Sequence, residues 1–403
     1  MTPGRSLGIL AGVAAILIVG LWLVFGRQPG SPAATASPPA PFAGTTSRPS
    51  SIGSAPPAGG PVDQAGTFPD GLWAIRSTSL WISADAGATW STGTIPTSPS
   101  LSDPPSTLVD VLDASHIWVL TGDDFGSGGS GDMTGTKDAI TQDRLALTVN
   151  RSADGGRTWS RVVIDGTYPG SFQALHFVDA TQGYLVISPG RFDTTESVVL
   201  RTADGGQTWH VAGTGGWLGT LLATPDASTI WAASAGDAGP VERRMFAVSR
   251  DAGRTWTDVM LPGVPSAIGQ WVRFAQPPIF IGSTGIALVA PNDGSGISDI
   301  DRSDDGGRTW TRVATTSSPS LAVLRQDAWL RAGAAPGVLE VTTDAGVTWH
   351  TLATVGLPPA ATITWLGFSD STHGALTAST GLPATSGLYV SQDGGSTWRL
   401  DPP

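Results

Sequence analysis

Carboxylates are the side chains whose spacing in this sequence could carry chemistry, since one Asp recurs within the same eight-residue pattern. The pattern reads [Ser/Thr]-x-Asp-x-Gly-x-Thr-Trp and occurs seven times, one copy being residues 152–159. The seven carboxylates are Asp85, Asp154, Asp204, Asp251, Asp305, Asp344 and Asp393. A carboxylate can ligate a metal ion or transfer a proton. A motif present in every repeat cannot mark one active site, however, so the repetition favours a structural role for all seven.

Each copy of the pattern lies between two short runs of apolar character, as expected for a tight turn that joins two β-strands. Residues 197–200 (SVVL) before one copy and residues 161–164 (RVVI) after another are examples. We expect the Asp side chain to accept hydrogen bonds from backbone N–H groups two or three residues further on. The Gly at the fifth position can adopt a positive φ angle, and we expect the Thr and Trp to begin the outgoing strand.

Other residues that could bind metal ions are scattered along the chain. The five histidines are His116, His176, His210, His350 and His373. They form no cluster with zinc spacing. Asp123, Asp124 and Asp132 could supply oxygen ligands to calcium, but their spacing does not match an EF-hand loop. The absence of cysteine excludes disulfides, thiol catalysis and Cys-ligated metal. We therefore predict no bound metal and no cofactor.

A second repeated element indicates how many strands each unit contains. Residues 111–120, 177–186 and 368–376 each read as strand, Asp-led turn and strand, upstream of a copy of the eight-residue pattern. Each unit thus supplies four strands, A and B around this turn and then C and D around the pattern. Successive pattern Asp residues lie 39 to 69 residues apart, about 51 on average. That period is typical of propeller blades, and we predict an all-β fold, a β-propeller with seven four-stranded blades.

The eight-residue pattern resembles the Asp-box, or bacterial neuraminidase repeat, of the sialidase-like superfamily, and the resemblance covers about residues 71–400. The spacing and strand order most resemble the photosystem II assembly-factor-like propellers, which implies a binding or assembly scaffold. A sialidase would need a Tyr–Glu nucleophile pair and arginines for the substrate carboxylate. Of the three tyrosines here, Tyr184 and Tyr389 fall inside predicted strands. We assign no catalytic residues, and the alternative function is a cell-surface glycoside hydrolase.

The blade topology predicts where a ligand would bind. In a four-stranded blade the A–B and C–D turns share one face of the ring, and the B–C and D–A connections share the other. Loops on a rigid scaffold carry specificity, so we expect a binding rim opposite the Asp-boxes, built by units two to five and including the long loop 121–144. The predicted rim residues are Asp123, Asp124, Arg191, Asp193, Trp217, Glu242, Arg243 and Arg244. Asn292, Asp293, Asp299 and Asp301 are expected in the matching loop of unit five.

The ends of the ring are irregular in sequence. Unit one starts at residue 71 without a clear strand A, for which residues 66–68 are the candidate. Unit seven ends directly after its box, so no spare strand is left to exchange between the termini. A six-bladed ring with a partial extra unit is the alternative.

The N-terminal segment indicates the compartment. Residues 7–25 form an uninterrupted run of 19 apolar residues between Arg5 and Arg27, long enough to span a bilayer as a helix. We predict an uncleaved signal anchor, with residues 1–27 forming a cytoplasmic stub and a single transmembrane helix. Residues 28–66 are rich in Pro, Ala, Ser, Thr and Gly and are predicted to be a disordered linker. The propeller, residues 67–403, would then lie on the extracytoplasmic side of the cell membrane.

Charge excludes one large class of partner. The net charge is −11, from 33 acidic and 22 basic residues, which argues against nucleic-acid binding. The sequence therefore predicts a monomeric, membrane-anchored propeller that binds a protein or glycan ligand. We expect it to act as a scaffold for a membrane-protein complex or an envelope component.

Overall fold

The computed structural model describes residues 62–97, 106–122, 147–164, 171–188, 197–215, 218–234, 245–262, 272–274, 278–291, 296–318, 320–382 and 385–401. All of them belong to one compact unit. Within these ranges, no helix combines the length and the apolar character that crossing a membrane requires. The predicted transmembrane segment, residues 7–25, lies outside them, so membrane anchoring stays a prediction.

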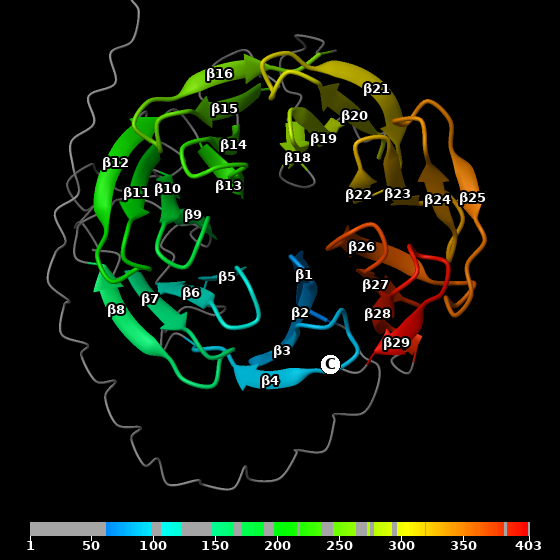
Figure 1. The fold of residues 1–403 in the computed structure, drawn as a ribbon, viewed down its shortest axis with the longest axis horizontal. Helices are drawn as coiled ribbons and strands as arrows, with labels where there is room; N and C mark the ends of the chain where they lie inside the picture. The colour runs from blue at the N-terminus through cyan, green and yellow to red at the C-terminus, as the bar shows by residue number, and fades with distance from the viewer. Residues whose placement is uncertain are drawn as a thin grey trace, which may run out of the picture. The chain divides into compact units, whose positions relative to one another are not determined.

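The described residues form seven antiparallel sheets arranged as the blades of a β-propeller, which confirms the predicted fold class and blade number (Figure 1). Blades 1 and 2 contain β1 (Gln64–Phe68), β2 (Gly71–Arg76), β3 (Ser79–Ser83), β4 (Ser91–Thr94), β5 (Ser106–Val111), β6 (Ile117–Gly122), β7 (Leu147–Ser152) and β8 (Ser160–Ile164). Blades 3 and 4 contain β9 (Ser171–Phe177), β10 (Gly183–Ser188), β11 (Ser197–Thr202), β12 (His210–Gly215), β13 (Leu218–Ala223), β14 (Ile230–Ser234), β15 (Met245–Ser249) and β16 (Thr257–Met260).

The remaining three blades complete the ring. Blade 5 contains β17 (Val272–Phe274), β18 (Ile279–Ile281), β19 (Thr284–Pro291), β20 (Ser298–Ser303) and β21 (Thr311–Thr316). Blades 6 and 7 contain β22 (Leu321–Arg325), β23 (Ala328–Ala332), β24 (Leu339–Thr342), β25 (His350–Leu352), β26 (Thr362–Phe368), β27 (Gly374–Ser379), β28 (Gly387–Ser391) and β29 (Arg399–Asp401). Strand order in each sheet follows the chain, except that β17 and β18 share the innermost position of blade 5 by both pairing with β19.

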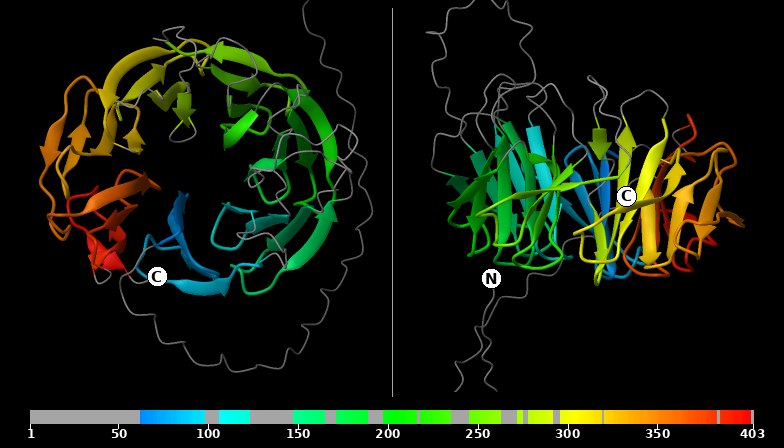
Figure 2. Two further views of the ribbon diagram at one scale, coloured as in Figure 1. Left: turned by 180° about the vertical axis from the view of Figure 1, so that it is seen from behind. Right: turned by 90° about the horizontal axis from the view of Figure 1, so that it is seen from above.

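The turns formed by the eight-residue pattern, which we call boxes, and the A–B turns share one face of the ring. In six blades of the described structure, a backbone N–H of the box donates to a carbonyl of the A–B turn, as from Gly155 to Ser115 (3.1 Å) and from Gly205 to Thr181 (2.7 Å). We call this side the box face. The B–C and D–A connections leave the strands at the opposite side, the loop face, and the strands run between the two (Figure 2).

The core lies between the blades rather than inside them. Buried apolar side chains of the described residues gather in seven clusters, and each joins two neighbouring blades. Trp118 of blade 2 stacks on Phe177 of blade 3 with ring centroids 3.7 Å apart. Trp231 of blade 4 meets the edge of Trp310 of blade 5 at 6.1 Å. Each sheet buries its faces only against its neighbours, so the blades depend on the closed ring for stability.

The ring closes without exchanging strands between the termini, as predicted. Blade 1 consists of β1–β4 and blade 7 of β26–β29, and their facing sides share one apolar cluster. Across this junction Arg399 donates to the carbonyl of Gly87 (2.8 Å) and Gln392 donates to that of Ala86 (3.2 Å). Strand A of blade 1 is β1, which extends the candidate residues 66–68 by two residues toward the N-terminus. The low apolar content of its sequence, QAGTF, explains why composition alone assigned its first residues to the linker.

One prediction for blade 5 and one prediction for the boxes were wrong. Asp299 and Asp301 were expected in a loop, but both lie in β20 and are buried, with Asp299 paired to the Arg312 guanidinium of β21 at 2.5 Å. A cation on the neighbouring strand makes such burial tolerable. The box Thr and Trp were expected to begin the outgoing strand, but each D strand begins only after the Trp, as β21 does after Trp310.

Candidate functional site

The seven box turns share one hydrogen-bond pattern, seen in the box of blade 2. Asp154 accepts through Oδ1 from the backbone N–H of Thr158 (2.9 Å) and through Oδ2 from its hydroxyl (2.7 Å). Ser152 donates its hydroxyl to Asp154 (2.8 Å) and accepts from the N–H of Gly156 (2.8 Å). The backbone N–H of Arg157, three residues after the Asp, also donates to Oδ1 (3.1 Å), as the sequence predicts, and the Thr158 donor lies one residue further along. The other six boxes repeat the first four of these bonds.

These bonds determine the ionisation of the box carboxylates. The hydroxyl and the backbone N–H of the Thr four residues on hold the pKa of Asp154, Asp251 and Asp344 at about 2. A general acid needs a pKa near the working pH. Carboxylates that are ionised at neutral pH and bonded into their own turns suit a structural role.

Two consecutive residues of each box adopt positive φ angles. The fifth residue is always Gly, with φ between 78° and 91°. The fourth is Gly in four boxes and Ala in the others, where Ala86, Ala252 and Ala345 have φ of 53°, 60° and 58°. In six of the boxes, all except that of Trp90, the indole N–H of the box Trp turns back to the carbonyl of the fifth residue, as from Trp310 to Gly307 at 3.1 Å. This return explains why the Trp stays in the turn.

The predicted rim residues cannot be placed. Asp123, Asp124, Arg191, Asp193, Trp217, Glu242, Arg243 and Arg244 all lie outside the described residues. The ends of the flanking strands do show where these connections start. Strand β6 runs from its A–B turn on the box face toward the loop face, and β7 returns from there. The stems of loop 121–144 therefore lie on the predicted face.

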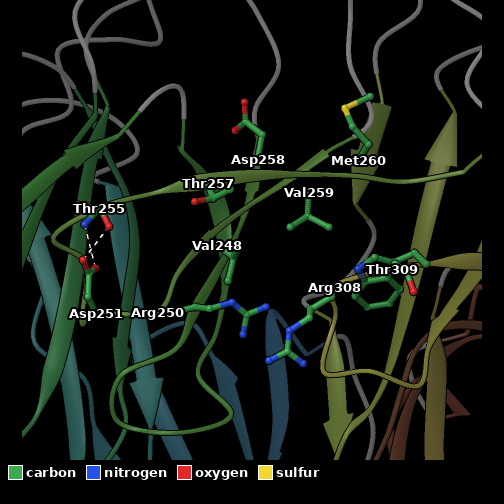
Figure 3. Close-up of a pocket in the computed structure, with 11 residues that line it drawn as sticks. Val248, Arg250, Asp251, Thr255, Thr257, Asp258, Val259, Met260, Arg308 and Thr309 are labelled. Carbon is green, nitrogen blue, oxygen red and sulfur yellow. Dashed lines mark hydrogen bonds between the residues drawn. The ribbon is translucent and has the colours of Figure 1, made fainter. Parts of the chain in front are cut away.

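A pocket of about 620 Å³ lies between the outer strands of blade 4 and the box of blade 5. Figure 3 shows Arg250 and Arg308 directing their guanidinium groups toward one another, with Asp258 and Met260 further along the pocket. Arg250 comes from the second position of the blade 4 box and Arg308 from the sixth position of the blade 5 box. The arrangement brings two guanidinium groups into one pocket that is also lined by the carboxylates of Asp251 and Asp258.

Both arginines are held by backbone contacts within the box region. Arg250 lies over the ring of Trp231, 5.7 Å from its centroid, and donates to the carbonyl of Gly306 at 3.4 Å. Arg308 donates to the carbonyl of Asp305 at 2.9 Å. A guanidinium carries five N–H donors, so each retains donors that can reach a bound anion. Such a pair can bind a carboxylate or phosphate through charge-assisted hydrogen bonds.

Sequence reasoning missed this pocket, although a signal was present. Arg250 is the only basic residue at the second box position among the seven copies. The repeat alone could not show that the sixth position of the next box lies beside it.

A second polar cluster lies on the inner wall and joins three blades. His176 of β9 contacts Asp110 of β5 through Nδ1 (3.4 Å) and Thr224, after β13, through Nε2 (2.8 Å). Asp110 also accepts the backbone N–H of Phe177 at 2.6 Å. Burial by itself would lower the pKa of His176, but the Asp110 carboxylate outweighs it and the net shift is upward. The cluster thus links three consecutive blades, 2, 3 and 4, through side-chain contacts.

Several solved structures share this architecture. YCF48 from Cyanidioschyzon merolae matches with a TM-score of 0.53 and 14% identity, covering 84% of this chain and 97% of that chain. A structure of YCF48 bound to a D1 peptide matches with a TM-score of 0.52 and 15% identity, covering 84% and 95%. A polysaccharide lyase PL25, an ulvan lyase bound to -[GlcA(1-4)Rha3S]-, matches with a TM-score of 0.51 and 12% identity, covering 85% and 96%. At these identities the likeness shows the fold.

No protein-family model matches the sequence. The comparison with curated proteins found no relative either. Function therefore has to be argued from the chain's own residues.

Proposed function

We propose that this protein is a membrane-anchored, extracytoplasmic propeller that binds a partner protein and acts as an assembly scaffold. One observation carries the proposal. The recurring carboxylates, which are the residues most suggestive of chemistry in the sequence, are all bonded into turns. What the described surface offers instead is a pocket that pairs two guanidinium groups with apolar side chains, which suits recognition.

The fold comparisons support a protein as the binding partner. A propeller of the same architecture, YCF48, has been solved with a D1 peptide bound. The apolar run at residues 7–25 supports placing the propeller beside a membrane. Strand β1 begins at the loop face, the face of the predicted rim. A partner in the same membrane would be within reach of that face.

The proposal is tested by capture of the partner from membranes. Full-length protein and a variant lacking loop 121–144 are crosslinked in intact cells, solubilised and purified. We expect a defined membrane-protein partner with the full-length chain and its loss with the deletion, while both forms melt at the same temperature. Protease added to spheroplasts should digest the propeller. Recovery of the propeller in the cytosol, or identical capture profiles from cells that lack the protein, would overturn the scaffold role.

The alternative is polysaccharide chemistry, favoured by the shared fold of the ulvan lyase. It is tested with sialosides, β-glucans and uronate polysaccharides as substrates. We expect no product from any of them. Turnover that survives purification to homogeneity would replace the scaffold by an enzyme.

A further inference from the structure

We propose that the pocket between blades 4 and 5 binds an extended segment of a partner protein, with a carboxylate of that segment held between Arg250 and Arg308. This assignment rests on the proposed function, because it takes a protein as the partner. It adds where that partner binds and which of its groups the arginines hold. The carboxylate is an acidic side chain or a chain terminus.

The charges of the pocket are available to a ligand. Among the described residues neither Arg250 nor Arg308 forms an ion pair. Asp251, which also lines the pocket, is bonded to Thr255 at 2.9 and 2.7 Å within its own box. The two guanidinium groups face one another (Figure 3), so an anion between them would relieve their mutual repulsion.

The arginine pair is specific to this junction. At two junctions the side chain at the second position of one box reaches the next box, and where the ring closes Gln392 donates to the Ala86 carbonyl. At the same position Arg250 meets Gly306. Only the box of blade 4 has a basic residue at its second position. No other junction can therefore pair a basic residue at that position with an arginine at the sixth position of the following box. The repeated frame thus places two arginines, together with Asp251 and Asp258, in the pocket at one of its junctions.

The rest of the pocket favours a peptide over a sugar. Val259 and Met260 of β16 line it, and Met260 is 55% exposed. Strand β16 is the outermost of its sheet and pairs on one edge only, with β15. An extended peptide can use such an edge and place alternate side chains in pockets. Sugar binding usually needs an exposed aromatic face, but the Trp310 ring in this pocket is only 6% exposed.

The test is selection from a random octapeptide display library panned against the full-length chain in detergent. We expect recovered peptides to share one Asp, Glu or terminal carboxylate next to apolar residues. A synthetic fluorescein-labelled peptide of the recovered sequence should bind the wild type, and replacing its acid by the amide should weaken binding at least tenfold. Binding should also weaken as salt rises, because it depends on charge.

Matched variants locate the site. R250A/R308A should lose at least tenfold in affinity for the selected peptide. R157A/R254A removes the same charge from boxes of blades 2 and 4, outside this pocket, and should bind like the wild type. R250E/R308E should lose the acidic peptide and gain binding to its Lys-substituted version, a result that a misfolded variant cannot produce.

Three results would overturn the assignment: recovered peptides without an acidic preference, full affinity in R250A/R308A, or tighter pocket binding by a uronate oligosaccharide than by any peptide. Failure here is distinguishable from failure of the scaffold role. If the membrane partner is captured equally by the wild type and by R250A/R308A, the scaffold stands and the pocket is not its contact.

Discussion

Substitution of Gly307 by Ala should destabilise the propeller strongly, because the fifth box residue lies against the neighbouring blade. Gly307 has φ of 78°, and a Cβ added there would overlap the outer ring atoms of Trp231. The left-handed conformation costs Ala about 1–2 kcal/mol, and overpacking a filled core costs a further ~1–3 kcal/mol. We therefore expect G307A to lower the free energy of unfolding by about 2–5 kcal/mol in total.

The adjacent glycine provides the control. Gly306 has φ of 71°, but a Cβ added there would meet no atom within 4 Å, so only the backbone contribution applies. Ala already occupies this fourth position in three other boxes, with φ between 53° and 60°. G306A should lower stability by only this backbone cost, about 1–2 kcal/mol. Denaturant unfolding of the full-length chains in a non-ionic detergent, followed by Trp fluorescence, measures both values.

A double variant tests the cause. W231F removes the ring atoms that a Cβ at Gly307 would meet, so G307A should cost less in the W231F background than in the wild type. Equal losses for G306A and G307A, or strictly additive effects of G307A and W231F, would refute the packing argument.

Three further predictions concern pH and ring closure. Because its pKa is lowered to about 2, Asp154 contributes stability above pH 3.8 that is lost as the pH falls toward 2; D154N should flatten this part of a plot of melting temperature against pH. Because the pKa of His176 is raised, its pairing with Asp110 stabilises fully below pH 6.5 and fades as the pH rises through the raised value. H176Q should therefore lose stability mainly at acidic pH, and a pH-independent loss would contradict the ion pair. Q392A/R399A removes two bonds across the ring junction, each worth about 1 kcal/mol, and hydrogen exchange should rise first in blades 1 and 7.

The local architecture could be predicted from the sequence because its causes lie close together in the chain. The donors and acceptors that close a box all fall within eight residues, as from Ser152 to Trp159, so the pattern suffices to identify the turn. Seven such turns separated by strand-like runs determined the all-β class and the number of blades. The same reasoning anticipated that the ring closes without strand exchange.

Details inside a unit were less predictable where long-range partners decide them. Asp299 and Asp301 look like loop residues in sequence, since charged residues are usually exposed. The structure buries both in β20, where the Arg312 guanidinium of the next strand pairs with Asp299. The fifth box Gly is required partly by its φ angle, which the pattern suggests, and partly by a Trp from another blade, which it does not.

Contacts between blades were decided only by the tertiary structure. The pairing of Arg250 with Arg308, and the cluster of Asp110, His176 and Thr224, join residues of different repeats. Repeat spacing specifies that blades follow one another, but it does not specify which side chains meet across a junction. That depends on the twist of each sheet and on the direction in which each side chain leaves its strand, and both become determined only when the ring closes.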